Sequence, residues 1–178
     1  MLVYLLGGLL ISQSPATSPA SSRSLPQTTV VLTINAPVER VFNYVVPVDL
    51  AHIFRATKGI PAVKSTSSVP GWDRVGLSRT VYFETGDTAR EQLTHYQRPV
   101  TFAYRVSHFS SVLKRIALHA DGNWVFTELP NHQTRVEWTY RVTPHNGLAR
   151  MILRRFLKRR FRPYMQSALT IIKNDLES

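Results

Sequence analysis

The feature that most constrains the fold of this chain is an alternation of apolar and polar residues that begins after Gly59 and continues for about 80 residues. Side chains along a β-strand point to opposite faces in turn, so a period of two predicts strands that bury one face. Turn residues such as Pro70-Gly71 and Thr85-Gly86-Asp87 separate the runs, which predicts antiparallel pairing. The predicted strands span residues 60–69, 75–84, 88–96, 100–109, 122–129 and 134–142.

Further elements flank these strands on both sides. Residues 28–34 are rich in β-branched side chains and predict a first strand. Pro37 suits the first turn of a short helix, and residues 49–54 predict a second one. Residues 146–178 are helical by composition, with Pro163 at the first turn of the final helix or at a kink. The predicted class is α+β, with about seven antiparallel strands, two short helices after the first strand and a long C-terminal helix.

The chain divides into a leader, residues 1–26, and one domain, residues 27–178. The leader joins an apolar run, Leu2–Ile11, to a Ser/Pro/Thr-rich segment that cannot build a core. The run is about half the roughly 20 residues of a membrane-spanning helix, but it suits the apolar part of a secretory signal. Ser18 and Ala20 would mark a cleavage site, although no basic residue precedes the run. The alternatives are a signal or membrane tether, and an unstructured or wrongly assigned start.

The charge balance and the absence of cysteine limit the classes of site and partner that the chain can have. With 22 Lys and Arg against 11 Asp and Glu, the formal net charge is +11, which favours anionic partners. Without cysteine, a disulfide framework, a thiolate zinc site and a Cys nucleophile are excluded. No histidine set has metal-ligand spacing, and Leu77 stands where a phosphate-binding loop needs lysine, so we expect no metal and no cofactor. The expected location is cytoplasmic or membrane-peripheral, with export if residues 1–20 act as a signal.

Three short motifs are INAPVERVF at residues 34–42, VGLSR at residues 75–79 and TRVEW at residues 134–138. They resemble the "I-x-A-P-x-E-x-V-F" opening, the "v-G-x-x-R" motif and the "T-x-V-x-W" final strand of the SRPBCC superfamily, also called START-like or polyketide cyclase/dehydrase-like. The likeness covers residues 28–177 and implies a helix-grip fold, in which a curved sheet wraps around the long C-terminal helix. It also implies an internal cavity for a small hydrophobic ligand, without implying a reaction.

Aromatic side chains share one face of the last predicted strands and would line such a cavity together with the terminal helix. The alternative is that they form an ordinary packed core. The predicted ligand-binding residues are Phe102, Tyr104, Trp124, Phe126, Trp138, Tyr140, Met165 and Leu169.

The candidate catalytic residues are Tyr104, Arg79, Glu91 and His108. Arg79 and Glu91 lie on neighbouring predicted strands and could pair at the cavity mouth, but a solvent-facing cross-strand ion pair is the favoured interpretation. His108 is the histidine that we would test as an acid or base, against an ordinary exposed role. His119-Ala120-Asp121 is assigned to a loop before a glycine.

Residues 150–162, RMILRRFLKRRFR, form a basic amphipathic helix with seven basic residues. Arg150, Arg154, Lys158 and Arg162 recur every four residues and are the predicted membrane-facing set. Ile152, Leu153, Phe156, Leu157 and Phe161 gather opposite them. The alternative is a core-packing helix whose outer face is merely soluble. Nucleic-acid binding is disfavoured, because no base-reading module is present.

Two functions remain open. The first is a carrier or sensor of a small hydrophobic ligand, lipid-like or polyketide-like, working at a membrane surface or in solution. The second is a cyclase- or dehydratase-type enzyme that uses an acid or base in the cavity.

Overall fold

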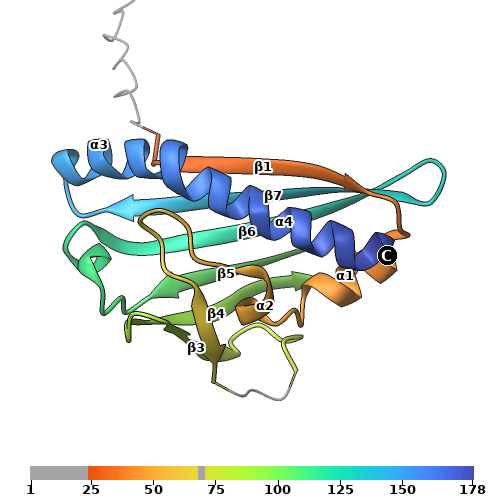
Figure 1. The fold of residues 1–178 in the computed structure, drawn as a ribbon, viewed down its shortest axis with the longest axis horizontal. Coiled ribbons are helices and arrows are strands. Elements are labelled where there is room, and N and C mark those ends of the chain that lie inside the picture. Colours follow the sequence, from red (N-terminus) through yellow and green to blue (C-terminus); the bar gives the residue numbers. More distant parts are fainter. Residues whose placement is uncertain (1–23, 68–70) are drawn as a thin grey trace, which may run out of the picture.

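The fold is one curved antiparallel sheet with a long helix across its concave face (Figure 1). The structure is a computed structural model and describes residues 24–67 and 71–178. The strands run in the order β1-β7-β6-β5-β4-β3-β2. Their bounds are β1 (Gln27–Ile34), β2 (Val63–Thr66), β3 (Ser78–Phe83), β4 (Thr88–Gln97), β5 (Thr101–Ser107), β6 (Ala117–Leu129) and β7 (Gln133–Pro144). The helical elements are α1 (Val38–Val45), α2 (Leu50–Ile53), the 3-10 turn η1 (Val112–Arg115), α3 (Gly147–Phe156), the π-helical segment η2 (Leu157–Phe161) and α4 (Arg162–Glu177).

The inner face of the sheet follows the alternation in the sequence. Trp124 on β6 is paired with Trp138 on β7 and with Phe102 on β5, and all three side chains are buried. Because side chains directly across an antiparallel pair lie close together, the aromatic residues of three strands form one layer. The rings of Trp124 and Trp138 stack with their centroids 4.4 Å apart.

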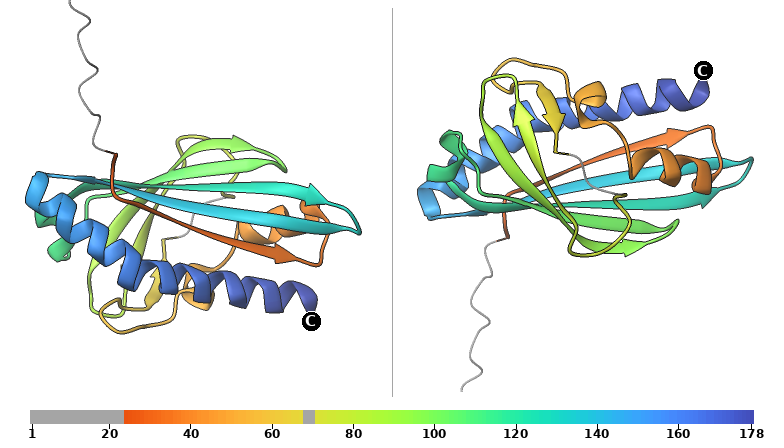
Figure 2. Two further views of the ribbon diagram at one scale, coloured as in Figure 1. Left: turned by 90° about the horizontal axis from the view of Figure 1, so that it is seen from above. Right: turned by 90° about the horizontal axis from the view of Figure 1, so that it is seen from below.

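The C-terminal helical segments form one nearly continuous rod over the concave face (Figure 2). Asn146 caps its start by accepting a hydrogen bond from the amide of Ala149. Pro163 lies in the first turn of α4, directly after the π-helical segment η2. The apolar face of α4 is buried through Met165, Leu169 and other residues of the same stripe. At the far end, Asp175 accepts a hydrogen bond from Tyr44 of α1 at 2.6 Å.

Two parts of the sheet differ from the prediction. The strand expected at residues 60–69 is shorter, because β2 spans Val63–Thr66; residues 68–70 lie outside the described residues. The assignment of His119-Ala120-Asp121 to a loop is wrong, because β6 begins at Ala117. Gly122 suggested a turn, yet it lies within the strand opposite Tyr104. A Cβ there would overlap the Tyr104 ring, so the glycine permits close approach rather than a turn.

The predicted fold class is confirmed. Seven antiparallel strands, two short helices after β1 and a long C-terminal helix match the expected helix-grip arrangement. The apolar run at Leu2–Ile11 lies outside the described residues, so its interpretation as a signal or tether stays a prediction.

Candidate ligand cavity

The interior side chains become smaller along the strands toward the α3 end. On β6 the inward residues are Phe126, Trp124, Gly122 and Ala120 in that direction. On β4 the inward position at the same end is Ala89, which is also buried. Since α3 and η2 cover this end with an unbroken rod, the small side chains leave space that the helix does not fill.

That space is an outer chamber of about 310 Å³ between the sheet and the α3–η2 rod. Its size is at the lower end of the range for small-molecule sites. The sheet contributes mainly small apolar groups, and η1 closes one side with Val112 and Leu113. Residues that line the outer chamber include Ala89, Val106, Ala120, Val142, Leu153 and Phe156.

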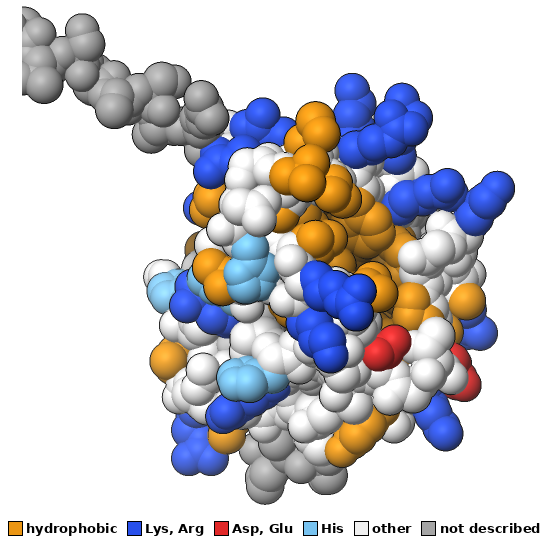
Figure 3. Space-filling view, turned by 90° about the vertical axis from the view of Figure 1, so that its left-hand side faces the viewer, with side chains coloured by type: hydrophobic (Ala, Val, Ile, Leu, Met, Phe, Trp, Pro, Cys, Tyr) orange, Lys and Arg blue, Asp and Glu red, His pale blue; other side chains and the backbone are white. Residues whose placement is uncertain are grey.

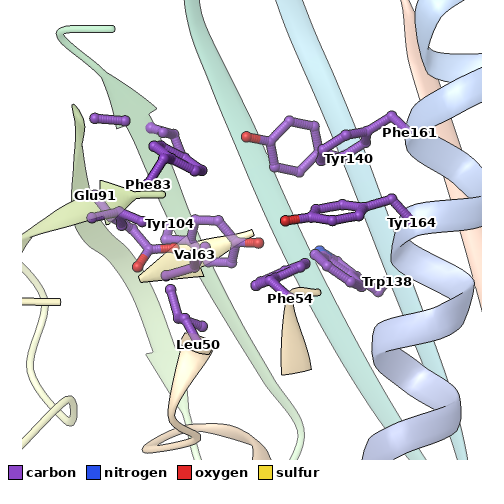
Figure 4. A pocket seen from close by; sticks show the side chains of 13 residues that line it. Leu50, Phe54, Val63, Phe83, Glu91, Tyr104, Trp138, Tyr140, Phe161 and Tyr164 are labelled. Atoms are coloured by element: carbon purple, nitrogen blue, oxygen red, sulfur yellow. The ribbon is translucent and has the colours of Figure 1, made fainter. Parts of the chain in front are cut away.

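An inner chamber of about 90 Å³ lies beside the outer one. The two chambers share Phe83, Tyr140, Phe161 and Tyr164 as lining residues, so they are neighbouring parts of one cavity. Figure 4 shows the hydroxyl groups of Tyr104, Tyr140 and Tyr164 directed into the space between the sheet and α4. The inner chamber also contains Glu91, Tyr104 and Trp138, which makes it the polar end of an otherwise apolar cavity.

The Arg79–Glu91 pair is buried, and the favoured expectation of a solvent-facing pair is wrong. Arg79 Nε donates to Glu91 Oε2 at 2.6 Å, and the side chains are only 9% and 6% exposed. The guanidinium also lies 4.3 Å from the ring centroid of buried Trp72, a cation–π contact. Glu91 alternates with Ala89 and Leu93, so its inward position could have been predicted from the period of two. The pair satisfies both charges where water is excluded.

Tyr104 and Trp138 bring two hydrogen-bond donors to the inner chamber. Burial raises the pKa of the Tyr104 phenol, and the charge of Glu91 raises it further, so the phenol stays protonated. Among the residues that the structure describes, Trp138 Nε1 is the only fully buried side-chain nitrogen or oxygen without a hydrogen-bond partner. An unsatisfied buried donor is costly, so a group at this position that accepts a hydrogen bond would be stabilised.

Burial also raises the pKa of Tyr140 and of Tyr164. The Tyr164 hydroxyl donates to the carbonyl of Pro61 at 3.1 Å, which ties α4 to the loop before β2. Both phenols therefore stay neutral over the physiological range, which suits an apolar wall.

The remaining predicted site residues divide into three places. Phe102 and Trp124 line a small void of about 30 Å³ next to the inner chamber. Phe126, Met165 and Leu169 are buried, and none of them lines the two chambers. His108 is exposed, and its Nδ1 lies 2.9 Å from the hydroxyl of Ser107. The structure thus brings Tyr104, Arg79 and Glu91 together and leaves His108 outside.

Several lining residues were missed by the sequence reasoning. Phe54, Val63 and Phe83 reach the inner chamber from α2, β2 and β3. Ala89 and Ala120 line the outer chamber. The sequence feature that could have identified them is a small side chain at an inward-facing position. Phe161 and Tyr164 close the cavity from the helix side.

The predicted membrane-facing set covers the side of the helix that faces β1. Arg154 donates to the carbonyl of Ser24 at 3.0 Å, and Arg150 donates to the same oxygen at 3.2 Å. Arg162 donates to the carbonyl of Thr29 at 3.4 Å, whereas Lys158 is exposed. Of the apolar side chains opposite this set, Ile152 is 44% exposed, while its neighbour Leu153 is fully buried.

Within residues 24–67 and 71–178, no cluster of His, Asp and Glu side chains suits a metal ion. In the same ranges, no helix has the length and apolarity to cross a bilayer.

Comparisons with known proteins identify a matching family and solved structures with a similar fold. A family model described as "polyketide cyclase / dehydrase and lipid transport" matches residues 26–177. Comparison with curated proteins finds no match. Among solved structures, the Zhui aromatase/cyclase from Streptomyces sp. R1128 is 16% identical with a TM-score of 0.61, covering 86% of this chain and 94% of that one. XoxI from Bacillus cereus is 15% identical with a TM-score of 0.61, covering 86% and 97%. Ara h 8.0201 is 14% identical with a TM-score of 0.56, covering 84% and 98%.

At these identities the solved structures show the fold alone, while the family model covers most of the chain. The strand order and the terminal helix over the concave face are consistent with the family whose model matches the chain. The chain belongs to the polyketide cyclase / dehydrase and lipid transport family of the SRPBCC superfamily.

Proposed function

We propose that this protein is a carrier or sensor of a small hydrophobic ligand held in the outer and inner chambers. The observation that carries the proposal is the outer chamber of about 310 Å³, walled by apolar side chains of the sheet and of the α3–η2 rod. Burying apolar ligand surface there contributes about 25 cal/mol per Å² before the costs of association. The description of the matching family, which includes lipid transport, supports the same class of partner.

The inner chamber supports a finer proposal about the ligand. Trp138 Nε1 makes no hydrogen bond of good geometry and lies near the Tyr104 hydroxyl, which keeps its proton. Both groups favour a ligand that ends in a carbonyl or hydroxyl oxygen and extends its apolar part toward α3. Such a ligand would be an amphiphile with one small polar end.

A second candidate is a cyclase- or dehydratase-type enzyme, and the observation that favours it is the carboxylate of Glu91 at the polar end of the cavity. Enolate chemistry needs a base near the carbon acid and a donor for the oxyanion, and Glu91 and Tyr104 would fill these roles. Against it, Glu91 already accepts a hydrogen bond from Arg79 at 2.6 Å, and His108 lies outside the cavity. The carrier is therefore preferred.

Native mass spectrometry of protein purified from its own host tests both functions. A carrier should retain a small molecule that dissociates unchanged on denaturation. If the molecule is added back to ligand-free protein and recovered chemically changed, and Glu91→Gln stops the conversion, the enzyme replaces the carrier.

A titration with the neutral fluorescent probe N-phenyl-1-naphthylamine tests the location of the ligand. Ala120→Leu places extra volume in the outer chamber and should weaken probe binding at least about tenfold, since the space is directly occupied. Ala103→Leu is the matched control, because Ala103 lies on β5 between the inward residues Phe102 and Tyr104 and points to the other face. Equal binding by both variants would place the ligand elsewhere.

A further inference from the structure

The outer edge of α3 carries exposed apolar side chains. Leu148, Met151 and Ile152 are 64%, 63% and 44% exposed. At 100° per residue they share one face of α3 with Arg155, while Leu153 on the opposite side is fully buried. Val112 of η1 is 74% exposed and also lines the outer chamber. We call this surface the α3 rim; it consists of Val112, Leu148, Met151, Ile152, Arg155 and Arg159.

Basic residues surround this apolar surface. Between residues 150 and 162 there are seven Lys and Arg and no acidic residue, and Lys114 and Arg115 lie on η1. Arg155 and Arg159 are exposed, and the ion pairs found in residues 24–67 and 71–178 do not include them. Figure 3 looks at this end of the molecule and shows hydrophobic side chains in a hollow, with Lys and Arg around it.

The α3 rim is continuous with the outer chamber. Leu153 and Phe156 line the chamber from the inner side of α3, and Val112 and Leu113 line it from η1. Asp87 is the one acidic residue in the lining, and its carboxylate accepts hydrogen bonds from Ser110 and Thr85. The mouth of the cavity therefore lies beside the apolar edge of α3 and among the Lys and Arg side chains around it.

We propose that the α3 rim docks onto a bilayer that contains anionic lipids, with the outer chamber open toward the membrane. Apolar side chains beside Arg and Lys are the combination that an interfacial helix needs, because the first insert among acyl chains and the second meet the headgroups. The part of this proposal that concerns ligand exchange rests on the proposed function. The docking surface itself does not.

Other partners fit this surface less well. Single-stranded nucleic acids require exposed aromatic platforms, and Tyr82 on β3 is the only aromatic residue among the exposed large hydrophobics of residues 24–67 and 71–178. A second copy would bring two strongly positive surfaces together, which electrostatic repulsion opposes. Neither partner accounts for both the apolar edge and its charge.

The path of the chain supports the same orientation. Ser24, the first described residue, lies against α3, where its carbonyl accepts a hydrogen bond from Arg154. Twelve residues of sequence separate Ile11 from Ser24, a span of at most about 47 Å. The apolar run Leu2–Ile11, if retained, therefore joins the domain at the end that carries the α3 rim.

Flotation with vesicles tests the docking surface on the full chain. Wild type should float with vesicles of equal parts phosphatidylglycerol and phosphatidylcholine at about 0.1 M salt, and much less at about 1 M salt or with phosphatidylcholine alone. Arg155→Gln/Arg159→Gln should lower the partition coefficient roughly 25-fold, since each surface-proximal basic residue contributes about fivefold. Met151→Ser/Ile152→Ser should lower it about tenfold and leave the salt dependence unchanged.

The matched control is Arg40→Gln/Arg98→Gln, which removes the same charge near the opposite end. Arg40 lies on α1, and Arg98 is two residues after Tyr96, whose ring centroid is 5.6 Å from that of Phe42 on α1. The control should bind vesicles within about threefold of wild type, because distant charges are screened.

Three results would overturn the proposal. One is the absence of wild-type flotation with anionic vesicles. Another is an equal loss in the rim and control variants. The third is binding of a duplex oligonucleotide that depends on Arg155 and Arg159 while vesicle binding does not. Probe titration of Arg155→Gln/Arg159→Gln without vesicles should match wild type, so failure of the ligand site and failure of docking are distinguishable.

Discussion

The two ends of the concave sheet face differ in how closely their side chains pack against the helices. At the α1 end, the ring of Phe42 meets those of Phe102 and Phe126 edge to face, with centroids 6.1 and 5.2 Å apart. At the α3 end, β4 and β6 present small residues such as Ala89 and Ala120, and a chamber of about 310 Å³ remains. One sheet and one helical rod thus enclose both a packed core and a cavity.

The difference teaches that the size of inward side chains, rather than the fold, decides where the cavity lies. Interiors normally reach crystal-like packing density, so a row of small residues under a helix that does not move closer leaves space. Arg79, Glu91 and Tyr104 lie where the two regions meet and bound the polar end of the cavity. The following predictions test this contrast.

Removal of Arg79 should have the largest effect. Arg79→Met leaves Glu91 buried without its partner, which should lower the free energy of unfolding by about 3–5 kcal/mol, measured in urea. Arg79→Met/Glu91→Leu should recover most of the loss, because no charge then remains buried. A loss below about 1 kcal/mol in the single variant would mean that the pair is as exposed as a surface ion pair, and the boundary between the two regions would disappear.

Gly122→Ala should be next. The added Cβ overlaps the Tyr104 ring, so we expect a loss of about 1–3 kcal/mol in the free energy of unfolding. In a Tyr104→Ala background the same change should cost far less, and the difference between the two costs measures the contact. If the two substitutions lowered the free energy of unfolding additively, the close approach of β5 and β6 would be contradicted.

A matched pair on β7 compares the two ends directly. Val136 is fully buried at the packed end, while Val142 lines the outer chamber. Val136→Ala should cost about 2 kcal/mol and Val142→Ala about 1 kcal/mol, because a side chain beside a cavity loses fewer contacts. Equal losses in urea unfolding would show that the chamber end is as tightly packed as the other.

The smallest effect concerns the polar contacts that hold α4 at the packed end. Hydrogen bonds from Tyr44 and His52 lower the pKa of Asp175 below its ordinary value of 3.8. A lowered folded-state pKa contributes stability above the unfolded value and loses it as pH falls through the folded one. Asp175→Asn should therefore cost less than about 1 kcal/mol at pH 7, with the difference from wild type shrinking below about pH 4.

Thermal unfolding of both proteins from pH 7 to pH 2 measures this difference. Asp49→Asn, at another partly exposed carboxylate that caps α2, is the control for a general loss of negative charge. A difference from wild type that grows with acidity would reverse the sign and contradict the assigned cause.

Sequence reasoning predicted the order of the elements well and the site less completely. Period-two alternation located β4 and β7 to within two residues. It failed at His119-Ala120-Asp121, since Gly122 has the same appearance in a turn and at a close approach within a strand. The aromatic residues were correctly placed on the inner face. The sequence pattern could not distinguish Phe126, which packs in the core, from Tyr104, which lines the cavity.

The sequence by itself determined the sheet, the helix that crosses it, the inward aromatic layer and the strongly basic C-terminal segment, because these depend on local periodicity and composition. Only the tertiary structure decided that Trp72 covers the inward Arg79–Glu91 pair and that Ile152 is exposed. Burial depends on which distant element covers a side chain, and that information is absent from the spacing of residues along one strand or helix. The cavity likewise exists only where α3 and η2 pass over the smallest side chains of β4 and β6.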